Sequence, residues 1–314
     1  MNADSSFRAD TESYNLLLKI WTRGAAALAE GKGVGDINQV YHALDDIPEE
    51  LAHEGVYSAK DAAERSSSIL NDMVERYLRG DSVTAVPTTE SFNLVMQGWI
   101  KSYAGAELVV DRVLDLFDRM KEWSDSGVTG RDEDDHIVNG DAGKWIQISP
   151  NTDTYSSVID TYAQVNDGQV VVAEVEKLLD FLRENHDENG DDTSSLKPTI
   201  KVANAAIIAI SKYKPDERYK GKHEKWDKAK KAQEIYNEWR KIYKKSGDDA
   251  FKPNCQTYTS VISAYSRCGC TAAAERAQGL FDALISEYET SGDKHMKPTA
   301  KTFTEVSHLR LIMC

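Results

Sequence analysis

The stretch SPNTDTYSSVIDTY, from Ser149 to Tyr162, decides the fold. Its proline, Pro150, is followed by Asn151, a residue type whose side chain accepts hydrogen bonds from the free N–H groups in the first turn of a helix. Apolar side chains then recur at helical spacing, at Tyr155, Val158, Ile159 and Tyr162. The stretch therefore predicts an amphipathic helix that begins just after its proline.

The same pattern occurs six times along the chain and aligns without gaps. The other copies begin at Arg8, Val86, Lys197, Lys252 and Lys297. Five copies share a proline position, occupied by Pro87, Pro150, Pro198, Pro253 and Pro298. Five also share an aromatic position, occupied by Tyr14, Phe92, Tyr155, Tyr258 and Phe303, and the fourth copy has Ala203 there. The predicted N-caps are Asp10, Thr88, Asn151, Thr199, Asn254 and Thr299.

A second apolar pattern follows each of the first five copies, with two adjacent apolar residues and a third one three positions later. These patterns end at Met73, Met120, Leu182, Trp239 and Leu284. From these residues to the next proline the counts are 14, 30, 16, 14 and 14. Because such regular spacing rarely arises by chance, we expect a second helix in each repeating unit. The longest spacing contains a polar stretch, Asp125 to Gly143, typical of a surface insertion.

The repeating unit is therefore predicted to be a helical hairpin, with a capped helix A, a turn and a helix B. One hairpin cannot bury its apolar stripe alone, so we expect an all-α fold, a right-handed α-solenoid of stacked hairpins. The expected repeats are 9–86 with an insertion at about 24–57, 87–149 with an insertion at about 125–143, 150–197, 198–252, 253–297 and a partial 298–314. Because the sixth copy stops inside helix A, we expect a truncated chain.

Composition narrows the choice of function. The chain has 314 residues and a net charge of −14, which repels polyanions at long range. No run of apolar residues is long enough to span a bilayer, so no membrane association is expected. The acidic first residues resemble neither a secretory signal nor a transit peptide. The four cysteines form neither a disulfide framework nor a zinc motif.

Residues 212–245 depart from this acidic balance, because they carry 13 Lys or Arg against 6 Asp or Glu. Aromatic residues such as Tyr236 and Trp239 are interleaved with them. One interpretation is a phosphate-binding patch with stacking aromatics. The other is a solvated helix B with its aromatics buried, because Tyr236 and Trp239 fall on core positions of the repeat. In either case the expected phosphate contacts are Lys212, Lys214, Arg218, Lys220 and Lys222.

The proline, the Thr/Ser-aromatic-Asn/Ser/Thr opening and the Leu-Phe-x-x-Leu ending of helix B resemble the pentatricopeptide repeat, related to tetratricopeptide-like helical repeats. Examples of the opening are Thr154-Tyr155-Ser156 and Ser91-Phe92-Asn93. The copies are longer and less regular than the family repeat and resemble those of some algal organellar proteins. The resemblance implies a non-catalytic protein that holds single-stranded RNA on its concave face, about one base per repeat, in a mitochondrion or chloroplast. Such binding would affect RNA processing, stability or translation.

The resemblance also implies which residues contact each base: the one after the aromatic, together with the one after the next proline. These pairs are Asn15 with Thr88, Asn93 with Asn151, Ser156 with Thr199, Asn204 with Asn254, and Thr259 with Thr299. A short amide or hydroxyl on a rigid helix can present hydrogen bonds to a base edge. Capping alone also explains the second member of each pair. Lys201, Lys301 and the basic segment favour the C-terminal half for RNA.

A protein-binding scaffold of the same fold is the alternative. The family has an aliphatic residue two positions before the aromatic, but this chain has Glu12, Glu90, Asp153, Lys201, Gln256 and Lys301 there. Together with the acidic net charge, these residues favour protein partners. We find no catalytic motif, metal-ligand pattern or nucleotide fingerprint. We therefore expect no enzyme activity, no cofactor, no metal and no small-molecule substrate.

Overall fold

The computed structural model describes residues 9–31, 58–79, 84–126, 128–129, 145–146, 148–165, 168–185, 196–212 and 222–313. The two predicted insertions lie largely outside these residues, although the first helix continues to Ala29, inside the first of them. The chain divides into two compact units, Met1–Ser157 and Val158–Cys314. Each unit is described separately.

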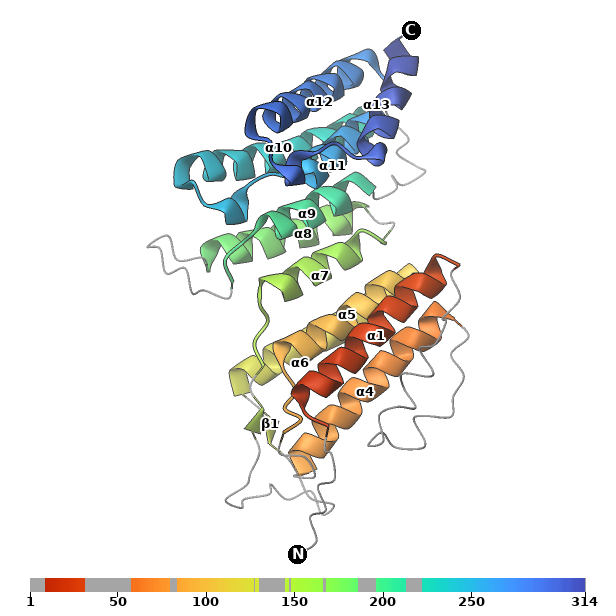
Figure 1. The fold of residues 1–314 in the computed structure, drawn as a ribbon, viewed down its shortest axis with the longest axis vertical. Coiled ribbons are helices and arrows are strands. Elements are labelled where there is room, and N and C mark those ends of the chain that lie inside the picture. The colour runs from red at the N-terminus through yellow and green to blue at the C-terminus, as the bar shows by residue number, and fades with distance from the viewer. Residues whose placement is uncertain are drawn as a thin grey trace, which may run out of the picture. The chain divides into compact units, whose positions relative to one another are not determined.

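The first unit contains two helical hairpins (Figure 1). Their helices are α1 (Thr11–Ala29), α4 (Ala59–Arg79), α5 (Thr89–Ser102) and α6 (Ala106–Ser126). Helix α1 packs against both α4 and α5, α4 also packs against α5, and α5 packs against α6. A short antiparallel ladder, β1 (Val128–Thr129) with β2 (Trp145–Ile146), flanks the predicted second insertion. The sequence showed no strand pattern there, because two residues are too few for one.

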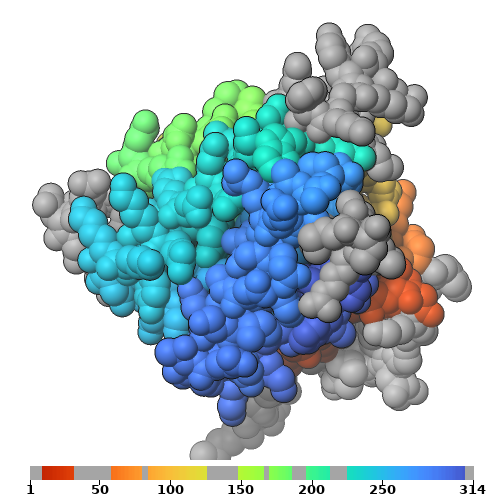
Figure 2. Space-filling model, turned by 90° about the horizontal axis from the view of Figure 1, so that it is seen from above, coloured from red at the N-terminus to blue at the C-terminus, as the bar shows by residue number. Residues whose placement is uncertain are grey.

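The second unit repeats this arrangement. Its helices are α8 (Gly168–Glu184), α9 (Ile200–Lys212), α10 (Lys222–Ser246), α11 (Cys255–Ser266), α12 (Thr271–Ser291) and α13 (Ala300–Met313), with short 3-10 helices η2 (Asp249–Phe251) and η3 (Lys294–Met296). Helix α7 (Thr152–Tyr162) spans the division between the units. Figure 2 shows the side chains of α10 to α13, cyan to blue, packed together in this unit.

Within each unit, A helices pack against their own helix B and against the next helix A. Helix α1 contacts α4 and α5, α9 contacts α10 and α11, and α11 contacts α12 and α13. Helix B also contacts the next helix A in the pairs α4–α5, α8–α9, α10–α11 and α12–α13. This nearest-neighbour pattern is that of stacked hairpins. The prediction of an all-α solenoid of helical repeats is confirmed.

The core consists of the stripes that the sequence predicted. In α5 the stripe contains Phe92, Val95, Met96 and Trp99, and all four side chains are buried. The aromatic residue of helix A meets an aromatic residue of the preceding helix B edge to face: Phe117 with Tyr155 at 5.3 Å, Tyr236 with Tyr258 at 5.1 Å, and Phe281 with Phe303 at 5.6 Å. Such contacts add about 0.5–1.5 kcal/mol to the burial of apolar area.

Five of the six predicted N-caps are confirmed. Asp10, Thr88, Asn151, Asn254 and Thr299 accept a hydrogen bond from the backbone N–H three residues later. In the last four, the hydroxyl at that third position also accepts the N-cap N–H, which completes a capping box. Thr199 is the exception: its hydroxyl oxygen is buried with no partner among the described residues. The third residue after it is Val202, which has no polar side-chain atom to complete a box.

Lysines before two of the prolines connect successive repeats, a feature that the sequence analysis missed. Lys197, before Pro198, pairs with Asp248 at 2.6 Å, and Lys252, before Pro253, pairs with Asp293 at 2.7 Å. The two aspartates also cap η2 and η3 through the N–H groups of Ala250 and His295. Lys252 holds the pKa of Asp293 below its usual value. The loops before the last two prolines, which have equal lengths, thus contain equivalent contacts.

The capping box of α11 provides a stability test. Thr257 is fully buried and exchanges hydrogen bonds with Asn254. We expect Thr257→Val to lower the free energy of unfolding by about 1–2 kcal/mol. The substitution removes the hydroxyl that accepts the Asn254 N–H, and this N–H is then left without an acceptor. Urea denaturation measures the loss. The matched control is Thr290→Val, at an exposed position of α12, which should change stability by less than about 0.5 kcal/mol. Equal effects at the two positions would contradict the capping assignment.

Candidate nucleic-acid interface

The predicted base-contacting pairs lie at the N-terminal ends of the A helices. The residue after the aromatic is the fifth residue of its helix, at the start of the second turn, and its partner is the N-cap of the next helix A. In four of the five pairs the two residues belong to one hydrogen-bonded network. The structure therefore brings these predicted partners together across the boundary between repeats.

The pair of Asn93 and Asn151 shows the geometry most fully. The Asn93 amide Nδ2 donates to Asn151 Oδ1 at 3.1 Å. Its Oδ1 accepts from the Thr154 hydroxyl at 2.8 Å. Thr154 is the third residue of the capping box that begins at Asn151. One asparagine thus contacts both side chains of the next helix's cap, and both residues of the pair are half-buried.

The first and last pairs use the same hydroxyl position. The Ser91 hydroxyl accepts the Thr88 N–H and donates to Asn15 Oδ1 at 2.7 Å. Likewise the Thr302 hydroxyl accepts the Thr299 N–H and shares a 2.7 Å hydrogen bond with Thr259. The residue after the aromatic is therefore connected to the next N-cap through the third residue of the capping box.

The two remaining pairs, Asn204 with Asn254 and Ser156 with Thr199, lack this link through a capping-box hydroxyl. Asn204 Nδ2 donates to Asn254 Oδ1 at 3.4 Å, while Asn204 Oδ1 is buried with no partner among the described residues. Ser156 is half-buried and lies in the first unit, whereas Thr199 lies in the second. The two lysines predicted to favour RNA, Lys201 and Lys301, are exposed.

Burial divides the predicted residues into two groups. Asn15, Asn204 and Thr259 are only 6%, 4% and 5% exposed. Their polar atoms face the next repeat, where they support its cap. The half-buried or exposed members are Thr88, Asn93, Asn151, Ser156, Thr199, Asn254 and Thr299, although the Thr199 hydroxyl oxygen itself is buried.

The charged position two residues before the aromatic is also used between repeats. Glu90 of α5 forms an ion pair with Lys19 of α1, with Nζ and Oε1 2.7 Å apart. Both side chains are about half exposed, so the pair contributes little to stability. Its effect is electrostatic: the Glu90 carboxylate, which would repel a phosphate, is neutralised by a lysine on the neighbouring helix A.

A second set of cations, at equivalent positions of the A helices, was missed by the sequence analysis. Nine residues after the aromatic position, near the C-terminal end of helix A, lie Arg23, Lys101, Lys212 and Arg267. All four are exposed, and the equivalent residue of α7 is the half-buried Gln164. Extending the repeat alignment past the aromatic would have found them. Cations here complement the helix dipole, and at a repeating position they also suit a phosphate backbone.

Three cations act on one another in the second unit. Desolvation lowers the pKa of Lys212, and repulsion from Lys301 and Arg267 lowers it further, against the attraction of Asp160. Nearby, the Ser263 and Ser266 hydroxyls hold the carboxylate of Glu305, at 2.9 and 2.6 Å. The A helices of this unit therefore carry a cluster of positive charge with two acidic side chains, Asp160 and Glu305, beside it.

The basic segment, residues 212–245, includes residues that precede α10 and residues that belong to it. Lys214, Arg218 and Lys220 lie outside the described residues, and Lys222 is the first residue of α10, with its side chain outside them. Tyr236 and Trp239 are buried at 2% and 1% exposure. Of the two interpretations of the aromatics, core packing is correct for this pair, because they occupy the core positions of helix B.

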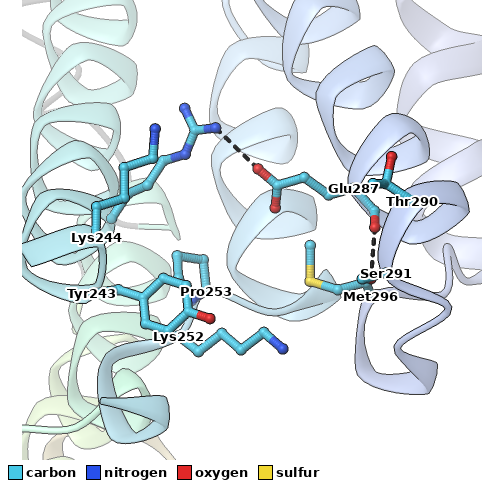
Figure 3. Close-up of a pocket in the computed structure, with 9 residues that line it drawn as sticks. Tyr243, Lys244, Lys252, Pro253, Glu287, Thr290, Ser291 and Met296 are labelled. Atoms are coloured by element: carbon cyan, nitrogen blue, oxygen red, sulfur yellow. Dashed lines mark hydrogen bonds and ion pairs between the residues drawn. The ribbon is translucent and has the colours of Figure 1, made fainter. Parts of the chain in front are cut away.

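The B helices are joined by ion pairs instead of presenting a polar site. Figure 3 shows residues that line a cavity of about 260 Å³, which come from α10, α12, η3 and the segment before α11. Arg240 crosses it to Glu287 at 3.0 Å. Between α8 and α10, Arg183 pairs with Glu238 at 2.7 Å, and Lys231 pairs with Glu176. The cations are matched by carboxylates on the neighbouring repeat, which indicates a structural role.

The described residues contain no group of three or more His, Cys, Asp or Glu that could hold a metal ion. Nor does any described helix have the length and apolar character needed to cross a bilayer.

Taken together, the stacked hairpins and the polar network at their A helices define an α-helical repeat protein. A comparison with protein families finds a PPR repeat at residues 256–286, which covers nearly all of α11 and most of α12. The predicted resemblance to pentatricopeptide-repeat proteins is confirmed, and the helical architecture agrees with it. No curated protein matches the chain.

The turn of this hairpin contains two cysteines with different surroundings. Burial raises the pKa of Cys268 to about 11, whereas Cys270 is half-buried at the N-cap of α12. Because the thiolate is the nucleophile, a raised pKa keeps Cys268 protonated and unreactive at pH 8. We expect iodoacetamide to modify Cys270 at least about tenfold faster than Cys268 in the native protein, as measured by peptide mass spectrometry. Equal rates in the native protein would show that the turn is open.

Proposed function

We propose that this chain is a non-catalytic protein that binds single-stranded RNA along its A helices and affects the processing, stability or translation of that RNA by occupying it. The observation that carries the proposal is that an exposed cation occupies one equivalent position in four A helices: Arg23, Lys101, Lys212 and Arg267. A backbone that carries one phosphate per nucleotide is a natural partner of cations that recur from repeat to repeat. The PPR repeat at 256–286 supports the same class of partner.

We assign two roles to the polar pairs. The residues with exposed surface would contact base edges: Thr88, Asn93, Asn151, Ser156, Asn254 and Thr299. The buried Asn15, Asn204 and Thr259 would orient their partners, because their polar atoms are directed at the next cap. Rigid positioning of a short polar side chain favours selective contact with a base. Lys201 and Lys301 would contact phosphates.

A protein-binding scaffold remains the second candidate, and a specific observation favours it. Glu12 and Asp153, at equivalent positions in the first and third A helices, are exposed. An acidic surface attracts basic protein segments and repels phosphate. The lysines at the equivalent position in the second unit, Lys201 and Lys301, favour RNA there. Phosphate contact at this position is therefore assigned to the second unit.

An organellar location, in a mitochondrion or chloroplast, is proposed on the family resemblance alone. No cofactor, metal or small-molecule substrate is part of the proposal.

The test is fluorescence anisotropy of the protein with a labelled, randomised short RNA, at several salt concentrations. We expect the double substitution Lys212→Ala/Lys301→Ala to weaken binding. The slope of log affinity against log salt should fall by about 0.7 for each lysine that contacts a phosphate. The matched control is Lys241→Ala/Lys245→Ala, which removes two exposed lysines from α10, a helix B. It has the same change of net charge and should leave the slope nearly unchanged.

Failure of the unsubstituted protein to bind the RNA at low salt would count against RNA as the ligand. The scaffold candidate would then be preferred. Equal effects of the two double substitutions would show that binding follows net charge and does not depend on the A helices.

A further inference from the structure

Tyr103 has a strained backbone conformation and an exposed side chain. It ends α5 as the C-cap, with φ 47° and ψ 34°, and it is the one described residue other than glycine with a positive φ. Its side chain is 70% exposed, the highest value among the large apolar side chains that the structure describes. It makes no hydrogen bond with any of the described residues. Neither packing nor hydrogen bonding therefore accounts for a tyrosine here.

Comparison with another hairpin shows what stability alone would favour. Counted from the aromatic position of helix A, Tyr103 is equivalent to Gly269, in the turn between α11 and α12. Gly269 has φ +64°, in the same left-handed region. Glycine adopts this region without a steric cost, whereas a side chain with a Cβ atom is strained there. The α5–α6 turn thus has an exposed aromatic residue where glycine would be more stable.

An exposed aromatic that costs stability indicates a role outside the fold. Two residues before it lies Lys101, one of the exposed cations nine residues after the aromatic position. Lys101 forms no ion pair with the described residues. A cation that suits a phosphate, next to a free aromatic face, is the combination with which proteins hold unpaired nucleotides.

We propose that Tyr103 is a stacking site for one unpaired base of a single-stranded nucleic acid, with Lys101 on an adjacent phosphate. The site rests on the proposed RNA-binding function but is separate from the polar pairs. Tyr103 lies roughly 15 Å along the helix from Asn93, more than the spacing of adjacent nucleotides in a stacked strand. The base at Tyr103 is therefore not the base that Asn93 and Asn151 would contact.

The test uses the full chain, the same randomised RNA and the substitution Tyr103→Gly. We expect Tyr103→Gly to keep or raise the Tm, because it relieves the backbone strain. We expect it to weaken RNA binding by about tenfold, the effect of losing one stacked base. The slope of log affinity against log salt should stay unchanged, whereas Lys101→Ala should lower the slope by about 0.7. Tyr103→Phe, which keeps the ring, should bind within about twofold of the unsubstituted protein.

Phe181→Ala is the control for nonspecific contact, because Phe181 is an exposed aromatic residue on α8, a helix B. It should leave RNA affinity unchanged. Unchanged affinity in Tyr103→Gly, while the unsubstituted protein binds RNA, overturns the stacking site and leaves the proposed function in place. A loss of affinity with a lower Tm, not restored in Tyr103→Phe, shows a structural role and also overturns the stacking site. No binding by the unsubstituted protein overturns both proposals.

Discussion

One hydrogen-bonding group recurs between successive A helices: the hydroxyl at the third position of the capping box, in Ser91, Thr154 and Thr302. When the Ser91 hydroxyl accepts the Thr88 N–H, its own proton is free to bind Asn15 of the preceding helix A. Thr154 has the same two roles toward Asn151 and Asn93. One buried group thus starts a helix and connects it to its neighbour. An N–H at a helix terminus and a buried amide both need hydrogen-bond partners. One hydroxyl is the partner of both groups here.

Local patterns in the sequence predicted the hairpins, the core stripes and five N-caps, because these depend on residues a few positions apart. The exception was also local: Val202 replaces the hydroxyl that Thr199 would need. The interaction partners of the capping-box hydroxyls and of Lys197 and Lys252 could not be predicted. These hydrogen bonds and ion pairs join residues that are 41 to 76 positions apart in the sequence. The cations nine residues after the aromatic were visible in the sequence, but they required the alignment to extend past the core positions.

In the candidate interface, the structure distinguishes residues buried between repeats from residues with exposed surface. The resemblance to the pentatricopeptide repeat treats both members of a pair alike. Burial distinguishes them: Asn15, Asn204 and Thr259 are buried between repeats, whereas their partners have more exposed surface and would contact the ligand in the proposed function. Substitutions at the buried members would therefore change stability and binding together. Lys101 and Tyr103 are better probes of binding, because their exposed side chains form no hydrogen bond or ion pair with the described residues.

The most direct test of the shared hydroxyl is a double-mutant cycle for stability on Asn15 and Ser91, whose side chains are 2.7 Å apart. Asn15→Ala, Ser91→Ala and the double substitution are compared with the unsubstituted protein by urea denaturation. The cycle isolates the interaction between repeats from the capping role of Ser91 alone. The account predicts a coupling free energy of about 1 kcal/mol, typical of a buried hydrogen bond. Effects that add to within about 0.3 kcal/mol would contradict it, because the hydroxyl would then cap its own helix without connecting the repeats.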